Sequence, residues 1–343
     1  MGIKKRILII YTGGTIGMVP GENGFVPKQG VLKKLLRGIY DLHRPDFPDW
    51  DLIEFSPVLD SSNIGVQDWN KIGRTIYEKY DLYDGFVVLH GTDTMAYSAS
   101  ALSFMLEGLN KPVIFTGSQI PLYLMRSDGM DNLVSSILVA SSEEIAEVCL
   151  YFSGKLLRGN RSKKVSSDQF DAFDSPNYPH LAEAGITINY NVQFLRKKEE
   201  RELRFCPFRE LPIGVLSVFP GLNFKLFDEI IVDKLKGVVI EAFGAGNIPH
   251  PGDDELAEIG RRAYEKGTII TVCTQCQRGA VTLGAYEASR TLIDAGVVSG
   301  GDMTIEAAVT KLYYLYSCGH EKEKIKTLME ENLRGERTGR ILQ

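Results

Sequence analysis

The fold is decided by residues 6–17, which read Arg6-Ile7-Leu8-Ile9-Ile10-Tyr11-Thr12-Gly13-Gly14-Thr15-Ile16-Gly17. The continuous apolar run from Ile7 to Ile10 predicts a short strand that is buried on both faces of a sheet. Gly13 and Gly14 allow backbone conformations and close approaches that a Cβ atom would block. Such a turn places the next side chain at the carboxyl edge of the sheet, where ligands bind in open α/β proteins. Thr15 is therefore the first candidate for chemistry, with an ordinary glycine turn as the alternative.

The same pattern of strand, polar turn and helix returns further along the chain. The apolar run from Phe86 to Leu89 ends in His90-Gly91-Thr92-Asp93-Thr94, and the run from Val113 to Thr116 ends in Gly117-Ser118-Gln119. Helical patterns lie between the strands, which predicts a parallel sheet with helices on both faces. Residues 18–27 are dense in Gly, Pro and Asn, so we expect a loop beside Thr15.

A charge run at residues 197–202 is typical of a solvated linker. We predict an N-terminal domain at residues 1–190, a linker at 191–212, and a C-terminal domain at 213–343. The strand pattern restarts at Val215, so the second domain is also expected to be α/β, and it is the smaller of the two.

Composition excludes several classes of protein. The chain has 343 residues, of which 44% are apolar and 24% are charged, close to globular averages. Its net charge of -5 argues against a nucleic-acid partner. No apolar run is long enough to span a bilayer. The apolar run after Arg6 meets a glycine turn where a signal peptide would have a cleavage site, so we expect a cytoplasmic protein without a membrane partner.

The five cysteines are odd in number and irregularly spaced, which favours free thiols over a disulfide framework. Cys273 and Cys276 form a CxxC pair, but no second pair of ligands accompanies it. We therefore expect no metal and no cofactor.

Several polar segments supply the groups needed for nucleophilic acyl transfer. Thr15 and Thr92 each follow a strand in a glycine context, and a lysine pair, Lys163 and Lys164, lies in a later loop. One hydroxyl could attack, a lysine–carboxylate pair could move protons, and backbone N–H groups at the glycine turns could hold an oxyanion. A lysine acts as a base only if its pKa falls, which burial or a second cation would achieve. Another strand end carries Asp60, Ser61 and Ser62, and a structural role remains the alternative for each of these segments.

At this point the sequence resembles a known family, the L-asparaginases and glutaminases. Its two signatures are matched by Thr12-Gly13-Gly14-Thr15-Ile16-Gly17 and Leu89-His90-Gly91-Thr92-Asp93-Thr94-Met95. The resemblance continues through Gly117-Ser118-Gln119, Gly159-Asn160-Arg161, Ala172-Phe173-Asp174-Ser175-Pro176-Asn177, Gly244-Ala245-Gly246-Asn247 and Thr274-Gln275-Cys276. This resemblance covers essentially the whole chain. Within the family, the sequence is similar to the type I, cytosolic branch.

The resemblance implies a larger N-terminal flavodoxin-like parallel-sheet domain and a smaller C-terminal Rossmann-like α/β domain. It also implies hydrolysis of L-asparagine to aspartate and ammonia, with minor glutaminase activity, by a homodimer or homotetramer. Thr15 would be the nucleophile, and Thr92, Asp93 and Lys164 would form a second triad. Asp60 and Ser61, with Thr92 and Asp93, would bind the substrate.

Three features need comparison with the family pattern. Phe25 stands where the family usually has a tyrosine that assists the nucleophile. Tyr286 lies where some type I relatives bring a tyrosine from a neighbouring subunit. Some type I members have a regulatory amide site near Thr274 and Cys276. Here two other positions of that site read Lys163 and Glu241, and we hypothesise that these form an ion pair that occupies it.

Other readings stay open at this stage. A nucleotide-binding module would also use strand–glycine–helix units, but neither GxGxxG nor GxxxxGK[ST] occurs. An ammonia-generating amidotransferase subunit for tRNA-dependent amidation shares both signatures. It normally has an extra N-terminal domain, for which we expect no room before the first strand. A catalytically inactive relative is the third alternative.

Overall fold

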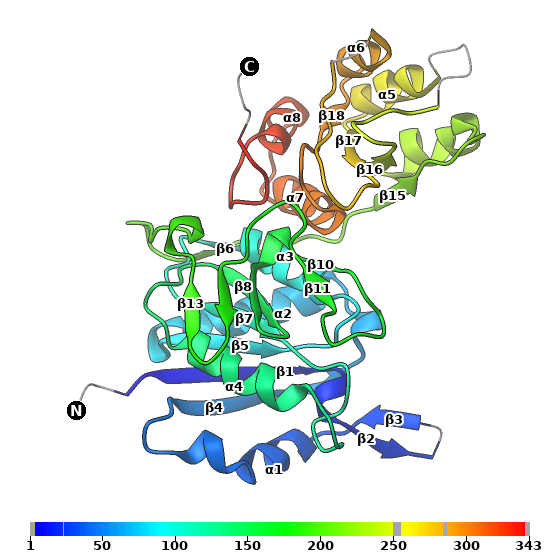
Figure 1. Ribbon diagram of the computed structural model, residues 1–343. Coiled ribbons are helices and arrows are strands. Elements are labelled where there is room, and N and C mark those ends of the chain that lie inside the picture. The colour runs from blue at the N-terminus through cyan, green and yellow to red at the C-terminus, as the bar shows by residue number, and fades with distance from the viewer. Residues whose placement is uncertain (1–3, 23, 250–254, 285–286, 340–343) are drawn as a thin grey trace. The chain divides into compact units, whose positions relative to one another are not determined.

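The computed structural model describes residues 4–22, 24–249, 255–284 and 287–339 (Figure 1). Backbone contacts divide the chain into two compact units, Met1–Pro207 (unit 1) and Phe208–Gln343 (unit 2). The boundary falls inside the stretch 191–212, for which the sequence predicts a linker. Within unit 1, the short strands β6 (Leu106–Glu107) and β14 (Arg204–Phe205) pair antiparallel, so the end of that unit is attached to its body.

Unit 1 is built on an eight-stranded sheet in the order β13-β12-β9-β8-β7-β5-β1-β4. Five neighbouring strands are parallel: β4 (Asp49–Leu59), β1 (Arg6–Gly13), β5 (Gly85–Leu89), β7 (Val113–Thr116) and β8 (Val148–Phe152). Three further strands extend the sheet antiparallel: β9 (Lys155–Arg158), β12 (Ala182–Ala184) and β13 (Ile188–Tyr190).

The parallel strands follow the flavodoxin-like order 2-1-3-4-5 when they are numbered along the chain. In that order the chain reverses direction across the sheet between β1 and β5, and ligands bind at the carboxyl ends of the strands on either side of such a switch point. The turns after β1 and β5 are the two glycine turns that the sequence analysis singles out. This topology places them next to each other.

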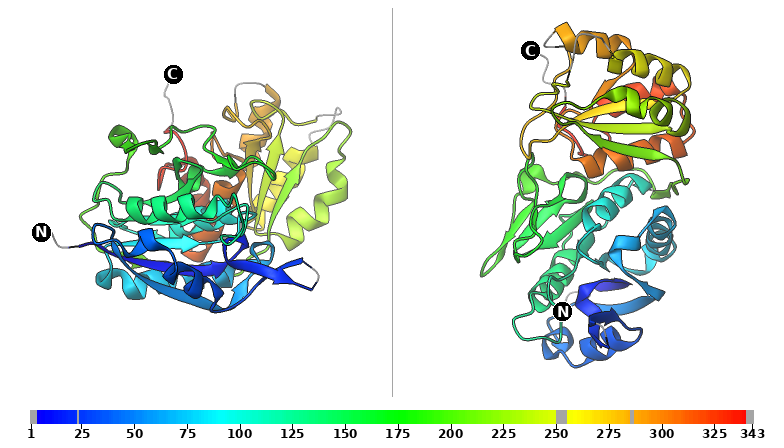
Figure 2. Two further views of the ribbon diagram at one scale, coloured as in Figure 1. Left: turned by 60° about the horizontal axis from the view of Figure 1, so that its bottom comes forward. Right: turned by 90° about the vertical axis from the view of Figure 1, so that its right-hand side faces the viewer.

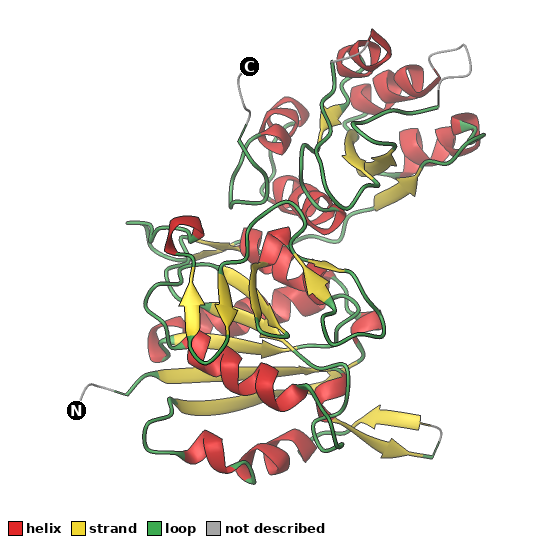
Figure 3. Ribbon diagram, in the orientation of Figure 1, coloured by secondary structure: helices red, strands yellow, loops and turns green. Residues whose placement is uncertain are grey.

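Helices cover both faces of this sheet (Figure 3). They are α1 (Val31–Arg37), α2 (Val66–Lys79), α3 (Met95–Met105) and α4 (Gly129–Ala140). Successive strand residues point to opposite faces. The face toward α1 and α4 buries an apolar cluster that includes Ile7, Ile9, Val87, Leu89, Ile114, Leu32, Leu36, Leu133 and Ile137. The intervening residues of β1 and β5, such as Leu8 and Val88, are fully buried as well. That burial explains the continuous apolar runs.

The strands β2 (Met18–Gly21) and β3 (Gly24–Pro27) form a hairpin, which extends away from the body of unit 1 (Figure 1). The expected loop is therefore wrong. In this separate two-stranded sheet Pro20 pairs with Phe25, and Gly24 has a φ of 126° that favours glycine. Two strands with almost no core carry little apolar periodicity, which is why composition alone suggested a loop. The Phe25 side chain is 50% exposed.

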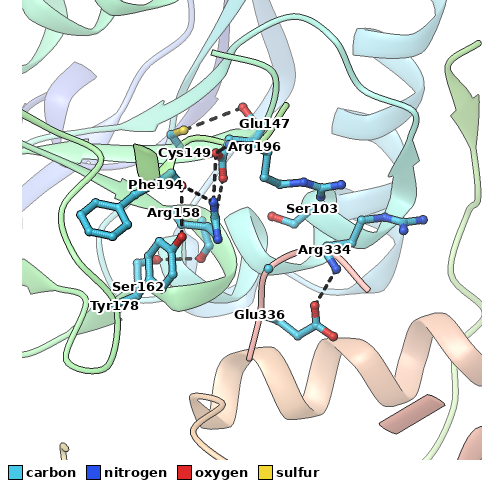
Figure 4. Close-up of polar contacts among 12 residues, drawn as sticks. Ser103, Glu147, Cys149, Arg158, Ser162, Tyr178, Phe194, Arg196, Arg334 and Glu336 are labelled. Atoms are coloured by element: carbon cyan, nitrogen blue, oxygen red, sulfur yellow. Dashed lines mark hydrogen bonds and ion pairs between the residues drawn. The ribbon is translucent and has the colours of Figure 1, made fainter. Parts of the chain in front are cut away.

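A buried polar network holds the segment after β13 against β8 and β9 (Figure 4). Arg158 donates through Nε to Glu147 (2.6 Å) and through Nη2 to the carbonyl of Phe194 (2.8 Å). The backbone N–H of Arg196 donates to Glu147 (2.8 Å), and the Arg158 guanidinium stacks over the Tyr178 ring at 4.4 Å. Both charged side chains are almost fully buried, so each needs the other.

Unit 2 has a four-stranded parallel sheet, β15-β16-β17-β18, covered by helices (Figure 2). Its strands are β15 (Ile213–Ser217), β16 (Gly237–Ala242), β17 (Ile269–Thr274) and β18 (Val298–Ser299). Its helices are α5 (Glu255–Glu265), α6 (Glu287–Asp294), α7 (Ile305–Ser317) and α8 (Lys322–Glu330). A fully buried ion pair between Lys311 on α7 and Glu336 anchors the C-terminal segment to this unit.

The two sheets confirm the predicted fold class, a two-domain α/β protein with a larger N-terminal parallel sheet. Among the described residues, no helix has both the length and the apolar character needed to cross a membrane.

Candidate active site

The turns after β1 and β5 touch each other through glycines. Gly14 has a φ of 88°, and a Cβ atom added to it would lie 2.4 Å from Cα of Gly91. Gly13 is equally constrained, since its Cβ would lie 1.9 Å from the carbonyl oxygen of Leu59 on β4. No other residue fits at these positions without moving the backbone. The double glycine therefore brings the ends of three neighbouring strands together.

Thr15 begins a single 3₁₀ turn, Thr15–Gly17, directly after this contact, and it is partly buried. Tyr11 supports the turn from below, because a Cβ atom on Gly17 would lie 2.2 Å from its hydroxyl oxygen. Burial raises the pKa of the Tyr11 phenol further above neutrality, so this hydroxyl, like an ordinary phenol, is protonated at pH 7. Thr15 is thus presented on a rigid, glycine-dependent turn.

Thr92, Asp93 and Lys164 form a compact polar cluster. Nζ of Lys164 donates to Oγ1 of Thr92 (2.9 Å) and to Oδ1 of Asp93 (2.7 Å). Thr92 is buried, whereas Asp93 is largely exposed. Lys164 comes from a two-stranded hairpin, β10 (Lys163–Lys164) with β11 (Phe173–Asp174), in which it pairs with Phe173. One cation therefore bridges a hydroxyl and a carboxylate that follow the same strand.

Gln119, at the end of β7, contacts the same hydroxyl: Oγ1 of Thr92 lies 3.2 Å from Oε1 of Gln119. The other end of this side chain, Nε2, donates to the carbonyl oxygens of Ser167 (3.3 Å) and Gln169 (3.1 Å). In the sequence Gln119 follows a predicted strand, and no function was inferred for it. Its position after β7, the fourth parallel strand along the chain, was the available signal.

The turn after β4 is joined to the same edge. Ser61 is buried, and a Cβ atom on Gly91 would lie 2.4 Å from its Oγ. The Thr94 hydroxyl donates to the Ser61 carbonyl (2.7 Å). Asp60 is exposed, and its Oδ1 accepts the backbone N–H of Ser62 (3.0 Å). Thr94 is a second residue whose contribution sequence reasoning missed.

A buried histidine supports the turn after β5. His90 is fully buried, with Nδ1 2.7 Å from the carbonyl of Gly91 and Nε2 2.8 Å from Oγ of Ser98. The indole N–H of Trp69 donates to the same Oγ (3.0 Å), so the Ser98 hydroxyl hydrogen is left for His90 Nε2. Burial lowers the pKa of His90 to about 4, and the imidazole is neutral at pH 7.

The structure brings together Thr92, Asp93 and Lys164, with the turns of Thr15 and of Asp60–Ser61 adjoining them. Tyr286 lies outside the described residues. Lys163 and Glu241 belong to different units, so their ion pair stays a prediction; within unit 2, the Ser217 hydroxyl donates to Glu241. Cys273 is buried and Cys276 exposed, and both are free thiols.

A doubly wound α/β sheet with a lysine–hydroxyl–carboxylate cluster at its switch point is characteristic of an α/β enzyme. Residues 6–196 match the family model "Asparaginase, N-terminal", and residues 212–329 match "Glutaminase/Asparaginase C-terminal domain". The chain belongs to the asparaginase family.

Three relatives show the range of this family. L-asparaginase 1 of Escherichia coli (strain K12) is 46% identical over 335 residues, which cover 98% of both chains. The crystal structure of L-asparaginase I from Vibrio cholerae superposes with a TM-score of 0.90 at 45% identity, covering 98% of this chain and 99% of that one. A glutamyl-tRNA(Gln) amidotransferase subunit of Methanobrevibacter smithii is 32% identical, covering 97% of this chain and 77% of that protein.

Proposed function

We propose that this protein hydrolyses L-asparagine to L-aspartate and ammonia through a threonine-linked acyl-enzyme, with minor activity on L-glutamine. The observation that carries this proposal is Nζ of Lys164 within hydrogen-bond distance of both the Thr92 hydroxyl and the Asp93 carboxylate. The family of named L-asparaginases to which the chain belongs supports the same substrate.

In the first step, the Thr15 oxygen attacks the carboxamide carbon and forms a new C–O bond. Its proton passes to a base, and the C–N bond then breaks as the leaving nitrogen takes up a proton and departs as ammonia. Backbone N–H groups at the strand ends would stabilise the oxyanion. In the second step, water attacks the ester carbon, aspartate leaves, and the Thr15 hydroxyl is restored.

The second triad, Thr92, Asp93 and Lys164, carries out proton transfer in this scheme. Neutral Lys164 would take the proton of Thr92, and Thr92 would activate a nucleophile or water. Asp93 holds the lysine through a charge-assisted hydrogen bond of 2.7 Å. Since Phe25 offers no phenol, the path through Thr92 and Lys164 is the one we favour for activating Thr15.

The substrate's two charged ends would be bound by the turns around Thr15. Asp60 and Asp93 are exposed carboxylates suited to the α-ammonium group. The Ser61 hydroxyl, next to Gly91, would donate to the α-carboxylate. These assignments use charge complementarity at the switch point, where ligands bind in this type of sheet.

We also propose that the enzyme acts in the cytoplasm as a homodimer or homotetramer and uses no metal or cofactor. Five free cysteines suit a reducing compartment. An ammonia-generating amidotransferase subunit is the alternative function. It is favoured only by the more distant relative, and we rank it second.

Ammonia release from L-Asn and L-Gln by wild type, Thr15→Ala and Thr92→Ala tests the proposal. Each alanine variant should lose orders of magnitude in kcat, because residues that act as a unit fail together. Thr75→Ala on α2 is the matched control and should retain wild-type activity, since its hydroxyl only donates to the Lys71 carbonyl of its own helix. Near-wild-type turnover by either site variant would refute the assignment of catalytic roles to Thr15 and Thr92. Ammonia release that requires an aminoacyl-tRNA partner would favour the alternative function.

A further inference from the structure

Gln119 makes three hydrogen bonds that connect the catalytic cluster to the loop of the Lys164 hairpin. The side-chain amide can present its oxygen to Thr92 and its nitrogen to two carbonyls, as it does here. The reverse orientation would place the amide oxygen against the carbonyl oxygens of Ser167 and Gln169, with no hydrogen to share. The network therefore determines which way this amide points.

The direction of the Thr92 bond follows from its other partner. A lysine ammonium can only donate, so Oγ1 of Thr92 accepts from Lys164 and must send its own hydrogen elsewhere. Oε1 of Gln119 is the acceptor, at 3.2 Å. In this state the lone pairs of Thr92 face Lys164. When Lys164 is neutral, the hydroxyl needs only to rotate to deliver its proton to the amine.

The backbone of Gln119 is itself held firmly. Its N–H donates to both carboxylate oxygens of Asp128, at 3.1 and 3.0 Å, and the next N–H, of Ile120, donates to the same carboxylate at 3.1 Å. Asp128 directly precedes α4 and is fixed in turn by the Asn132 side chain (3.2 Å). The amide thus projects from a rigid strand end.

The two carbonyls that Gln119 holds lie in the loop that joins β10 to β11. Lys164 is the last residue of β10, and Val165 donates to the carbonyl of Ala172 across the base of the loop (2.8 Å). Ser167 and Gln169 are exposed, and Gln119 ties both of their carbonyls to the end of β7, while Lys155 on β9 holds Asp171 at the far end of the same loop (2.7 Å). One side chain therefore accepts the resting hydrogen bond of the Thr92 hydroxyl and also holds the loop of the hairpin that carries Lys164.

We infer that Gln119 is a positioning residue that holds the Thr92 hydroxyl and the Lys164 amine in the relative position that proton transfer requires. The inference deepens the proposed function, on which it rests. Gln119 acts through Thr92 and the hairpin. Its loss should therefore slow turnover while leaving the binding of asparagine nearly intact.

The test compares wild type, Gln119→Leu, Thr92→Val and the double variant in the ammonia assay with L-asparagine. Gln119→Leu keeps the side-chain volume but removes all three hydrogen bonds. We expect kcat to fall about 10- to 100-fold, the range that small misplacements in an active site produce, with KM changed less than about threefold. Gln193→Leu, an exposed glutamine of unit 1, is the matched control and should leave kcat unchanged.

The double variant separates positioning from general loop stability. If Gln119 works through the Thr92 hydroxyl, Gln119→Leu should cost little further once Thr92→Val has removed that hydroxyl. Equal losses in both backgrounds, or a wild-type kcat for Gln119→Leu at an unchanged melting temperature, would overturn the inference. If Thr92→Val is too slow to measure, the split between kcat and KM in Gln119→Leu decides. A wild type inactive on L-asparagine would instead refute the proposed function.

Discussion

His90 should make the stability of unit 1 depend on pH below neutrality. Its imidazole is fully buried between the Gly91 carbonyl and the Ser98 hydroxyl, and burial lowers its pKa from 6.5 to about 4. At a pH between these two pKa values, His90 is protonated in the unfolded chain but neutral in the folded chain. Stability from this site is therefore complete above pH 6.5, falls as the pH drops from 6.5 toward 4, and changes no further below that.

The size of the effect follows from the shift. Each pKa unit corresponds to 1.36 kcal/mol. A pKa lowered from 6.5 to about 4 therefore means that folding favours the neutral imidazole over the charged one by about 3 kcal/mol. By pH 4.5 about 2.5 kcal/mol of this should be lost relative to pH 7. That is a large part of the 5–15 kcal/mol that stabilises a typical domain.

Urea unfolding of wild type and His90→Asn from pH 7 to 4.5 measures this loss. Both tryptophans of the chain, Trp50 and Trp69, lie in unit 1, so tryptophan fluorescence reports the unfolding of that unit. The variant should be less stable than wild type at pH 7, and the gap should shrink by about 2.5 kcal/mol at pH 4.5. His43→Asn, which removes a surface imidazole, is the matched control. A gap between wild type and His90→Asn that stays constant over this range would refute the reasoning.

Three further perturbations test the structure at other points. Gly14→Ala should reduce the free energy of unfolding much more than Gly30→Ala. Both glycines have positive φ, but of these two only Gly14 has backbone atoms within 2.4 Å of the new Cβ. Equal losses of stability in urea titrations would contradict this close approach. Glu147→Gln should destabilise unit 1 by about 3–5 kcal/mol, because it leaves the buried guanidinium of Arg158 without its carboxylate. A change under about 1 kcal/mol in urea unfolding would show that this ion pair is dispensable. Phe25→Tyr should raise kcat with little change in KM, because it returns a phenol to the hairpin after Thr15; an unchanged kcat would indicate that the second triad alone activates the nucleophile.

Much of the fold can be predicted from the sequence because its signals are local. The runs Ile7–Ile10 and Phe86–Leu89 are continuous and apolar, and the structure buries them on both faces of the sheet. Paired glycines after β1 mark a turn that only glycine can make. The family resemblance is confirmed by both family models and covers the N- and C-terminal parts of the chain. The hairpin at residues 18–27 escaped prediction, since a solvated pair of strands has no apolar face to produce a period.

By itself, the sequence determined which residues could do chemistry: hydroxyls, carboxylates and lysines placed directly after strands. Only the tertiary structure decided which of them meet. Thr92 and Lys164 are far apart in the chain, and their 2.9 Å contact exists because a separate hairpin folds back over the end of β5. The bridge from Thr92 through Gln119 to that hairpin follows from the same arrangement. Strand order and hairpin docking depend on the burial of residues distant in sequence, and short-range patterns do not encode them.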